Sequence, residues 1–182
     1  MMSLVIQGYS IRLAEVADIP YLSAVELAAA QLLRGYAPES VLAGTTDEVT
    51  FAAATLAGRL WVASRDNIPV GFALVKMLAE DLPHLEEIDV HPTHGRRGLG
   101  RALVRAVCDW AIACGYAMLT LTTFRNVPWN FPFYARLGFV EVSWETLRPE
   151  LATVVFEEAH RGLDPQTRAV MAYRSGPIGI RG

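Results

Sequence analysis

The chain has 182 residues, of which 52% are hydrophobic and 19% charged, and its formal net charge is −3. This length predicts one domain with a large core, and the composition excludes an intrinsically disordered chain. The small negative charge argues against broad nucleic-acid binding, which requires a basic face. The two cysteines, Cys108 and Cys114, suggest no disulfide framework, so we interpret them as small core residues and predict a cytoplasmic location.

No segment of the sequence has the character of a membrane anchor. The most apolar stretch, YLSAVELAAAQLL, is shorter than the roughly 20 residues that a spanning helix needs, and it contains Glu26. The first ten residues lack the basic region and the cleavage pattern of a secretory signal. We therefore predict no membrane partner, a single domain over residues 1–174, and a flexible tail over residues 175–182.

The first half of the chain predicts a strand, two helices and a hairpin. Residues 10–14 have strand character, and residues 15–35 predict a helix with Asp18 as its cap and Gly35 as its end. A second helix is expected over residues 45–58, capped by Thr45 or Thr46 and ended by Gly58. Residues 59–66 and 68–78 then predict two strands joined through a tight turn.

The second half begins with a strand over residues 84–90, which Pro92 interrupts. Apolar residues at steps of three and four then predict a helix from Leu99 to Gly115 that packs on a sheet. Residues 116–124 predict a buried strand and residues 129–139 a short helix capped by Asn130. Strands over 140–146 and 168–175 complete the prediction. Strand, loop, helix and strand in this order indicate a parallel crossover within a mixed sheet.

The loop over residues 91–98 has an unusual composition. The segment HPTHGRRGLGRAL combines three glycines with three arginines where the long helix begins. Free backbone N–H groups and the helix dipole at such a point favour an anion, most often a phosphate. A P-loop is excluded because no lysine follows the glycines, and a dinucleotide fingerprint is incomplete because Leu103 holds the place of its third glycine. A merely tight turn is the alternative reading.

Two separated motifs resemble a known family. VHPTHGRRGLGRAL is similar to the acetyl-CoA pyrophosphate loop of the GNAT superfamily of N-acetyltransferases, whose pattern is Gln/Arg-x-x-Gly-x-Gly/Ala. FYARLGF resembles the later signature of that superfamily, and IRLAEVADIPYL resembles its opening. The resemblance extends over about residues 10 to 175 and departs at two positions. Gly95 stands where relatives have Gln or Arg, so that Arg96 and Arg97 would substitute, and Val127 stands where relatives often have Asn.

The resemblance implies an α/β fold with a mixed, mostly antiparallel central sheet of about seven strands and helices on both faces. It implies an acyltransferase that moves the acetyl group of acetyl-CoA directly to a primary amine of a small molecule or peptide, without a metal. A homodimer is common among such relatives. A module that senses acyl-CoA without turnover, and a different acyl donor such as succinyl-CoA or propionyl-CoA, remain alternatives. The sequence does not identify the acceptor.

The resemblance also implies which residues contact the cofactor and which residue protonates the departing thiolate. The cofactor contacts are Ile88, Asp89 and Val90 through their backbone, Arg96, Arg97, Gly98, Leu99, Gly100 and Arg101 in the loop, and Asn130. Tyr134 occupies the family's general-acid position, where a phenol protonates the departing thiolate.

A base is expected because an amine with a pKa of about 10.4 is almost fully protonated at neutral pH. The candidates are Glu86 and Glu87, of which we slightly favour Glu86 because it shares strand parity with Ile88 and Val90. His84 and a water molecule are alternatives.

The remaining conspicuous side chains fit less specific roles. His84, His91 and His94 lack the helical spacing of a metal-binding pair, so no metal site is predicted. The aromatic residues Trp129, Phe131 and Phe133 either belong to the core or line the acceptor cleft.

Overall fold

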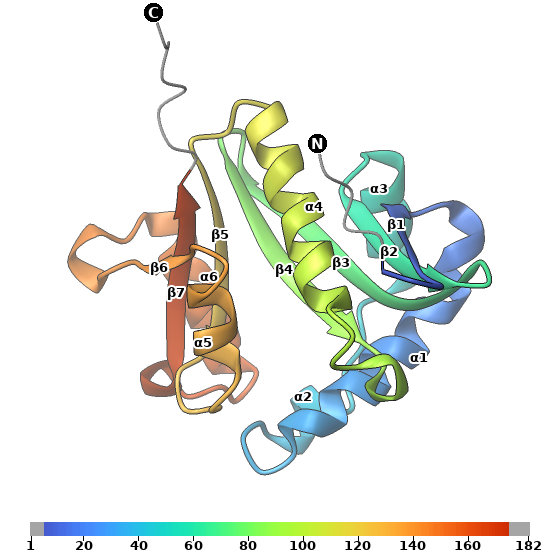
Figure 1. The fold of residues 1–182 in the computed structure, drawn as a ribbon. Coiled ribbons are helices and arrows are strands. Elements are labelled where there is room, and N and C mark those ends of the chain that lie inside the picture. The colour runs from blue at the N-terminus through green and yellow to red at the C-terminus, as the bar shows by residue number, and fades with distance from the viewer. Residues whose placement is uncertain (1–5, 175–182) are drawn as a thin grey trace, which may run out of the picture. The chain divides into compact units, whose positions relative to one another are not determined.

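The computed structural model describes residues 6–174, and its seven strands form one mixed sheet in the order β1-β2-β3-β4-β5-β7-β6 (Figure 1). The strands are β1 Ser10–Leu13, β2 Leu60–Arg65, β3 Ile68–Ala79, β4 Leu82–Val90, β5 Met118–Phe124, β6 Val140–Glu141 and β7 Arg168–Arg174. β4 and β5 pair in parallel, whereas β1 with β2, β2 with β3, and β7 with both β5 and β6 pair antiparallel. The predicted α/β class with a mixed sheet of about seven strands is confirmed.

Helices connect most of these strands. They are α1 Ile19–Ala30, α2 Glu39–Leu42, α3 Glu48–Leu56, α4 Leu99–Ala113, α5 Asn130–Ala135 and α6 Pro149–His160. Short 3-10 turns are η1 Val16–Asp18, η2 Gln31–Leu33, η3 Pro92–His94, η4 Trp144–Thr146 and η5 Pro165–Thr167.

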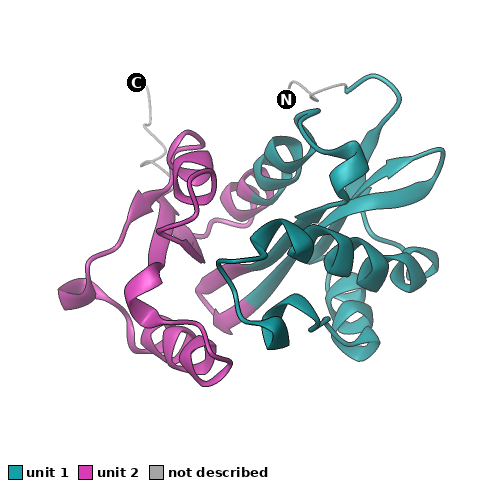
Figure 2. Cartoon of the chain, turned by 90° about the horizontal axis from the view of Figure 1, so that it is seen from below, with its two compact units in different colours: residues 1–76, 86–107 teal, residues 77–85, 108–182 magenta. Residues whose placement is uncertain are grey.

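The described residues form two compact units, each built from two stretches of sequence (Figure 2). The first unit comprises residues 6–76 and 86–107, and the second comprises residues 77–85 and 108–174. β3, β4 and α4 each begin in one unit and end in the other. The prediction of one domain over residues 1–174 is not tested by this division, and the predicted tail over 175–182 lies outside the described residues.

The core of the first unit lies where α1 and α3 pack on β2 and β3. Leu22 and Val25 of α1 are buried together with Phe51 of α3, whose ring meets Phe72 of β3 edge-on at 5.3 Å. The apolar faces of both helices pack on one face of the sheet, and water is excluded from the core between them. By length and composition alone, residues Val16–Leu33 would also suffice to cross a membrane, a test that core helices of globular proteins pass as well.

At the ends of these elements, the predicted cap position of α1 is confirmed and the predicted cap of α3 is corrected. Asp18 stands at the N-cap of α1, but its carboxylate accepts hydrogen bonds from Arg12 and from the Glu15 amide instead of from the helix. α3 is capped by Asp47, which accepts from the Thr50 amide at 2.7 Å, and not by Thr45 or Thr46. Thr46 does not cap α3 because its amide and hydroxyl donate to Glu26.

The predicted hairpin is confirmed, with β2 and β3 joined by Asp66 and Asn67. Both turn residues have positive φ, 51° and 64°, as a type I′ turn requires. Asn and Asp tolerate this left-handed conformation better than other non-glycine residues.

The second unit contains a helix that the sequence reading did not predict. α6 lies between β6 and β7 in the chain, and its Leu151 and Val155 are buried with Leu82 and Val170. The strand expected over residues 140–146 is only two residues long, because the chain turns through η4 toward this helix. Cys108 is buried as predicted, but Cys114, just after α4, is exposed.

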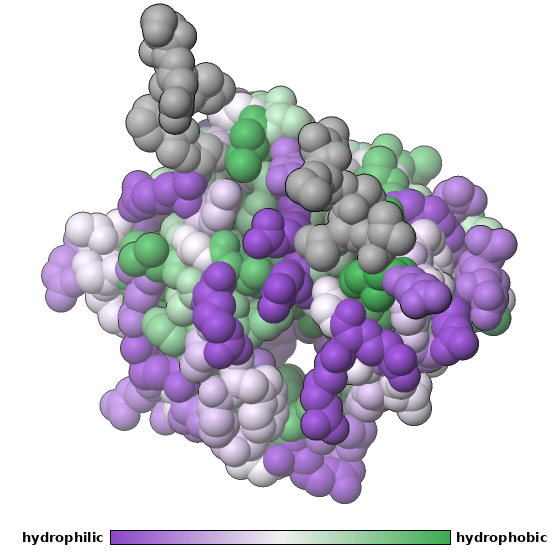
Figure 3. All heavy atoms as spheres, in the orientation of Figure 1, coloured by the Kyte–Doolittle hydropathy of each residue, from purple (hydrophilic) through white to green (hydrophobic). Residues whose placement is uncertain are grey.

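On the face drawn in Figure 3, hydrophilic residues predominate, and hydrophobic residues reach the surface in separate places. This distribution is ordinary for a globular protein.

Candidate active site

The anion loop, residues 91–98, joins β4 to α4 within the first unit. Gly98 has a φ of 86° and Arg96 a φ of 56°, so two of its residues have the left-handed backbone conformation. This conformation turns the chain sharply just before Leu99, the first residue of α4. Arg96 and Arg97 are exposed, whereas Leu99 is buried and fixes the start of the helix.

The loop leaves a row of backbone donors at the start of the helix. The first backbone hydrogen bond of α4 runs from the Ala102 amide to the Gly98 carbonyl at 3.0 Å, and the Gly95 amide donates to Pro92. Among the backbone hydrogen bonds of residues 6–174, none is donated by the six amides between them. These amides belong to Arg96, Arg97, Gly98, Leu99, Gly100 and Arg101. Such unpaired donors at a helix N-terminus are what an anionic group binds.

The lowered pKa of His94 is a second indication of positive charge around the loop. Burial lowers the pKa of His94, and the charges of His91, Arg65 and Arg97 lower it further. Its Nδ1 lies within hydrogen-bonding distance of the Tyr9 hydroxyl, at 2.9 Å. The positive charges of Arg65 and Arg97, which contribute to this shift, favour an anion at the loop.

The end of β4 is held against β3 by a close backbone approach. A Cβ atom at Gly71 of β3 would lie 2.8 Å from the carbonyl oxygen of Asp89, so only glycine fits there. The His91 amide also donates to the Val70 carbonyl at 2.8 Å. The strand segment expected to lie along the cofactor, Ile88 to Val90, is therefore fixed in the first unit at the same end of β4 as the anion loop.

Acidic side chains of β4 and α1 gather in the first unit. Glu87 and Asp89, two residues apart, alternate to the same face of β4, and the charges of Glu87 and of Glu26 from α1 act on Asp89. Burial, followed by the charges of Glu87 and Glu26, raises the pKa of Asp89 well above its usual range.

Glu86 and His84, the other base candidates, have different surroundings. Glu86 alternates to the opposite face of β4 from Glu87 and is partly exposed. His84 is buried in the second unit, where its Nδ1 lies 2.9 Å from Thr120 Oγ1. Because the Thr120 hydroxyl donates to the Pro83 carbonyl, it accepts from His84 at this nitrogen. His84 thereby links β4 to β5.

Tyr134 lies on α5 in the second unit. Its ring meets Phe133 at 5.0 Å and Phe139 at 5.9 Å, both edge-on, and its carbonyl accepts hydrogen bonds from the Leu137 and Phe139 amides. Gly138 ends the turn with a φ of 94°. This packing holds the partly exposed phenol ring on two sides.

The asparagine expected near Tyr134 has no clear counterpart. Val127, at the position where relatives often have Asn, is completely buried and belongs to the core. Asn130 is the first residue of α5 and not its cap, which is Trp129. Its amide donates to the Val127 carbonyl at 3.1 Å. The predicted contact of Asn130 with the cofactor stays a prediction.

The histidines show no metal centre in the described part of the chain. No group of three or more His, Cys, Asp or Glu side chains within residues 6–174 is arranged to hold a metal ion. His91 instead accepts from the Thr93 amide through Nδ1, at 3.3 Å, and caps η3.

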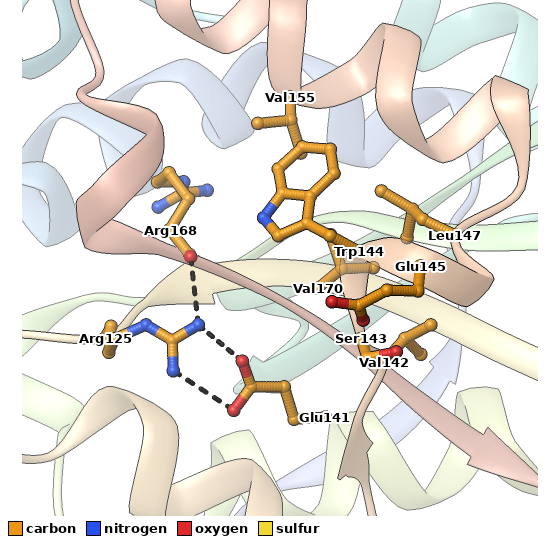
Figure 4. Close-up of a pocket in the computed structure, with 10 residues that line it drawn as sticks. All are labelled: Arg125, Glu141, Val142, Ser143, Trp144, Glu145, Leu147, Val155, Arg168 and Val170. Carbon is orange, nitrogen blue, oxygen red and sulfur yellow. Dashed lines mark hydrogen bonds and ion pairs between the residues drawn. The ribbon is translucent and has the colours of Figure 1, made fainter.

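A pocket of about 250 Å³ lies in the second unit, between β6, η4, α6 and β7 (Figure 4). Its walls are the indole of Trp144, the apolar side chains of Val155 and Val170, and the ion pair of Arg125 with Glu141. The sequence-predicted site residues are not among those that line it.

Comparisons with known proteins are consistent with this geometry. The model of the acetyltransferase (GNAT) family matches residues 27–139, which is more than half of the chain. Among solved structures, PaiA N-acetyltransferase from Thermoplasma acidophilum, in complex with coenzyme A, has a TM-score of 0.71 at 15% identity. The alignment covers 93% of this chain and 100% of that one.

Two further solved structures have similar folds. The ribosomal-protein-S18-alanine N-acetyltransferase from Escherichia coli has a TM-score of 0.64 at 20% identity, covering 96% of this chain and 99% of that one. The N-acetylglutamate synthase from Neisseria gonorrhoeae, complexed with coenzyme A and N-acetyl-glutamate, has a TM-score of 0.67 at 21% identity. This chain is covered to 91% and spans 35% of that longer chain. At such identities the likeness shows the fold.

Proposed function

Because this chain belongs to the GNAT family of acetyltransferases, we propose that it moves the acetyl group of acetyl-CoA directly to a primary amine of a small molecule or peptide. The family makes the chain an acyltransferase. The donor, the acceptor class and the roles of individual residues are the proposed part, as are a cytoplasmic location and a homodimer.

The observation that carries the proposal is the row of six amides, from Arg96 to Arg101, that donate none of the backbone hydrogen bonds of residues 6–174. A pyrophosphate carries the negative charge that these donors, the α4 dipole and the exposed arginines favour. Gly98, with its positive φ, lets the backbone approach the ligand closely. The residues present therefore fit the diphosphate of coenzyme A.

The chemistry requires a base and an acid from the protein. The thioester of acetyl-CoA supplies the activated acetyl group, and only an unprotonated amine attacks it. We assign the base to Glu87, which alternates to the same face of β4 as Asp89 and lies in a part of the first unit where Glu26 also acts on that face. Glu86 is the second candidate. Tyr134 is assigned as the acid, since a phenol with a pKa near 10 suits a departing alkyl thiolate.

The acceptor is proposed only as a class. One relative of similar fold is a ribosomal-protein-S18-alanine N-acetyltransferase and another is an N-acetylglutamate synthase. The same fold therefore supports both protein and small-molecule acceptors, and we propose a primary amine without choosing between them.

The test is an assay of thiol release from acetyl-CoA across a panel of small amines, amino acids and peptides with free N-termini. We expect release that depends on one group of amines and is lost in the Glu87→Gln variant. Tight binding of coenzyme A without release for any amine would support the acyl-CoA sensor instead. Comparing acetyl-CoA with propionyl-CoA and succinyl-CoA in the same assay identifies the donor.

A further inference from the structure

The residues just before β1 form a tight turn in the first unit. The Tyr9 amide donates to the Ile6 carbonyl at 2.9 Å, and Gly8, the third residue of this turn, has a φ of 81°. A type II turn has such a positive φ at its third position, where glycine is the usual residue. Gln7 and Gly8 are exposed, whereas Ile6 and Tyr9 are half-buried. The two larger side chains at the ends of the turn therefore pack against the protein.

Both of these side chains lie against the anion loop. The Tyr9 hydroxyl is within hydrogen-bonding distance of His94 Nδ1, at 2.9 Å, and the two rings meet edge-on with 5.8 Å between their centroids. Nearer the helix, Ile6 Cδ1 lies 3.9 Å from the position that a Cβ atom of Gly98 would take. The turn thus contacts the loop at one residue before and one residue after Arg96, where the backbone takes its left-handed bend.

Tyr9 is itself held in place by the pairing of β1 with β2. Ser10, the first residue of β1, is paired with Ser64 of β2, and their hydroxyl oxygens are 2.8 Å apart. This register places Tyr9 beside Arg65, whose guanidinium carbon lies 5.8 Å from the centre of the Tyr9 ring. A cation at this distance over an aromatic ring is attracted to it. Tyr9 therefore connects the anion loop to the edge of the sheet.

We propose that Tyr9 is a positioning residue for the cofactor, which acts through His94 to hold the anion loop in the shape that binds a diphosphate. The amides from Arg96 to Arg101 bind one anion together only when they point at the same place. A loop that must be ordered on binding loses affinity, and contacts that order it beforehand recover that affinity. This role rests on the proposed function, in which the loop binds the diphosphate of coenzyme A.

The first experiment measures the affinity of the whole protein for coenzyme A by calorimetry. Tyr9→Phe keeps the aromatic ring beside Arg65 and removes only the hydroxyl that meets His94. We expect its Kd to rise about three- to tenfold, as the loss of one hydrogen bond predicts. Tyr21→Phe, which removes the hydroxyl of an exposed tyrosine of α1, is the matched control and should leave the Kd unchanged.

Acetyl donors with and without the diphosphate separate this role from a general loss of structure. For acetyl-CoA, Tyr9→Phe should raise KM about three- to tenfold and change kcat far less. For S-acetylpantetheine, which has the same thioester but no phosphate, kcat/KM should stay within about twofold of the wild type. His94→Ala should weaken coenzyme A binding as well, and the double variant should bind no more weakly than His94→Ala alone, because both changes remove the same contact.

Hydrogen exchange of the ligand-free protein tests the effect on the loop without the cofactor. The amides of His94, Gly95 and Ala102 are hydrogen bonded to carbonyls within residues 91–98. In Tyr9→Phe these amides should exchange several-fold faster than in the wild type, because the loop opens more often. In Tyr21→Phe their exchange should be unchanged.

Unchanged exchange of these amides in Tyr9→Phe would overturn the inference. So would equal losses of activity with acetyl-CoA and S-acetylpantetheine, or a loss of affinity in Tyr9→Phe that adds to that of His94→Ala. If the amides exchange faster in Tyr9→Phe but the wild type binds coenzyme A no better than pantetheine, the proposed binding of the diphosphate fails, while the role of Tyr9 in holding the loop is supported.

Discussion

Gly98 has a backbone conformation that other residues adopt only with strain, and it lies where the cofactor phosphates are proposed to bind. Its φ of 86° makes valine unfavourable by about 1–3 kcal/mol, although a Cβ there would meet nothing closer than Ile6 at 3.9 Å. Relief of that strain would move the adjacent amides. We expect Gly98→Val to weaken coenzyme A binding by about tenfold or more, measured by calorimetry, because each lost hydrogen bond to a charged group costs about 1.5–3 kcal/mol.

Gly115 provides the matched control. It lies just after the other end of α4, has a φ of 79°, and has open space around its Cβ position. Gly115→Val should therefore lose similar stability and keep its affinity for coenzyme A. Equal affinities in the two variants would mean that the anion loop does not bind the cofactor.

Tyr134 allows the proposed acid to be tested without disturbing the packing. Tyr134→Phe keeps the ring contacts with Phe133 and Phe139, so the fold should be unchanged. We expect kcat to fall by about 100-fold or more with little change in acetyl-CoA affinity, because only the proton donor is removed. Tyr173→Phe, whose ring also contacts Phe139, should keep full activity. An unaltered rate in Tyr134→Phe would remove the phenol from the mechanism.

Individual side-chain partners were the least predictable feature at this scale. Sequence spacing placed Asp18 correctly at the start of α1 but not its ion pair with Arg12, six residues earlier. Thr46 was a predicted cap, yet it donates to Glu26 on another helix. Local patterns do not encode such contacts, because the donor arrives only through the tertiary fold. Glu87 and Asp89 are nearer in sequence, and alternation along a strand was the signal that they share a face.

At the scale of elements, α6 is anchored to β7 by a buried ion pair. Arg168 donates to Glu158 through Nε and Nη2, both at 2.8 Å, and the Thr122 hydroxyl donates to the same carboxylate. Burial raises the pKa of Glu158, but these bonds, with the charges of Arg168 and His84, outweigh it and leave the pKa lowered.

Removing one partner of this ion pair should be costly. Glu158→Gln leaves the guanidinium of Arg168 buried without its counter-charge, so we expect a loss of about 3–5 kcal/mol in the free energy of unfolding at neutral pH. A lowered pKa stabilises the fold above the unfolded value of about 4.3, and this contribution disappears as the pH falls through the folded pKa. The difference from wild type in urea unfolding should therefore shrink in acid.

The pair of Arg125 with Glu141 is the matched comparison, since both of its side chains are more than one-third exposed. Glu141→Gln should cost less than about 1 kcal/mol, as exposed ion pairs usually do. A loss in Glu158→Gln as small as this would mean that the buried pair does not hold α6.

Helices and strands could be predicted mainly where the sequence has a strong local pattern, such as an apolar repeat or a turn motif. The apolar repeat of α4 and the Asp66–Asn67 turn have such signals, and both elements are confirmed. α6 has one too, since Pro149 begins it and Leu151, Val154, Val155 and Glu158 recur at helical spacing. It was missed although residues 147–167, between the two expected strands, are longer than an ordinary connection, and this length was itself a signal of a further element.

At the scale of the whole molecule, the acidic residues make stability depend on pH in two opposite ways. The lowered pKa of Glu158 favours the folded state as the pH rises, whereas the raised pKa of Asp89 disfavours it. The folded chain holds a proton on Asp89 to a higher pH than the unfolded chain does, because burial and the charges of Glu87 and Glu26 raise its pKa. That contribution is fully present below the unfolded pKa of about 3.9 and is lost as the pH rises through the folded pKa. The pKa of Glu26 is raised in the same direction, by burial.

Asp89→Asn should therefore gain stability relative to wild type as the pH increases. The gain should begin at about pH 4 and level off once Asp89 is ionised in the folded wild type, because the variant has no proton to lose. Urea unfolding of both proteins across this range measures it. A difference that does not change with pH would show that Asp89 has an ordinary pKa in the folded protein.

The acidic group also shows what the sequence leaves open at this scale. Glu26 and Asp89 are separated by 63 positions, the difference of their numbers, and come together only because α1 packs on the sheet that contains β4. The loop and the tyrosine were predictable because each lies within one short motif. A group of side chains that come from two distant parts of the sequence can be recognised only once the fold is known.

The interleaved connectivity of the two units has a practical consequence for dissection of the protein. Because residues 77–85 belong to one unit and residues 86–107 to the other, no single cut separates them into intact halves. A fragment ending at Val107 would truncate α4 and leave residues 77–85 without β5 and α6, which belong to the same unit. Such fragments should be recovered insoluble or degraded, and split-protein reporters or circular permutants should instead open the chain at the exposed Asp66–Asn67 turn.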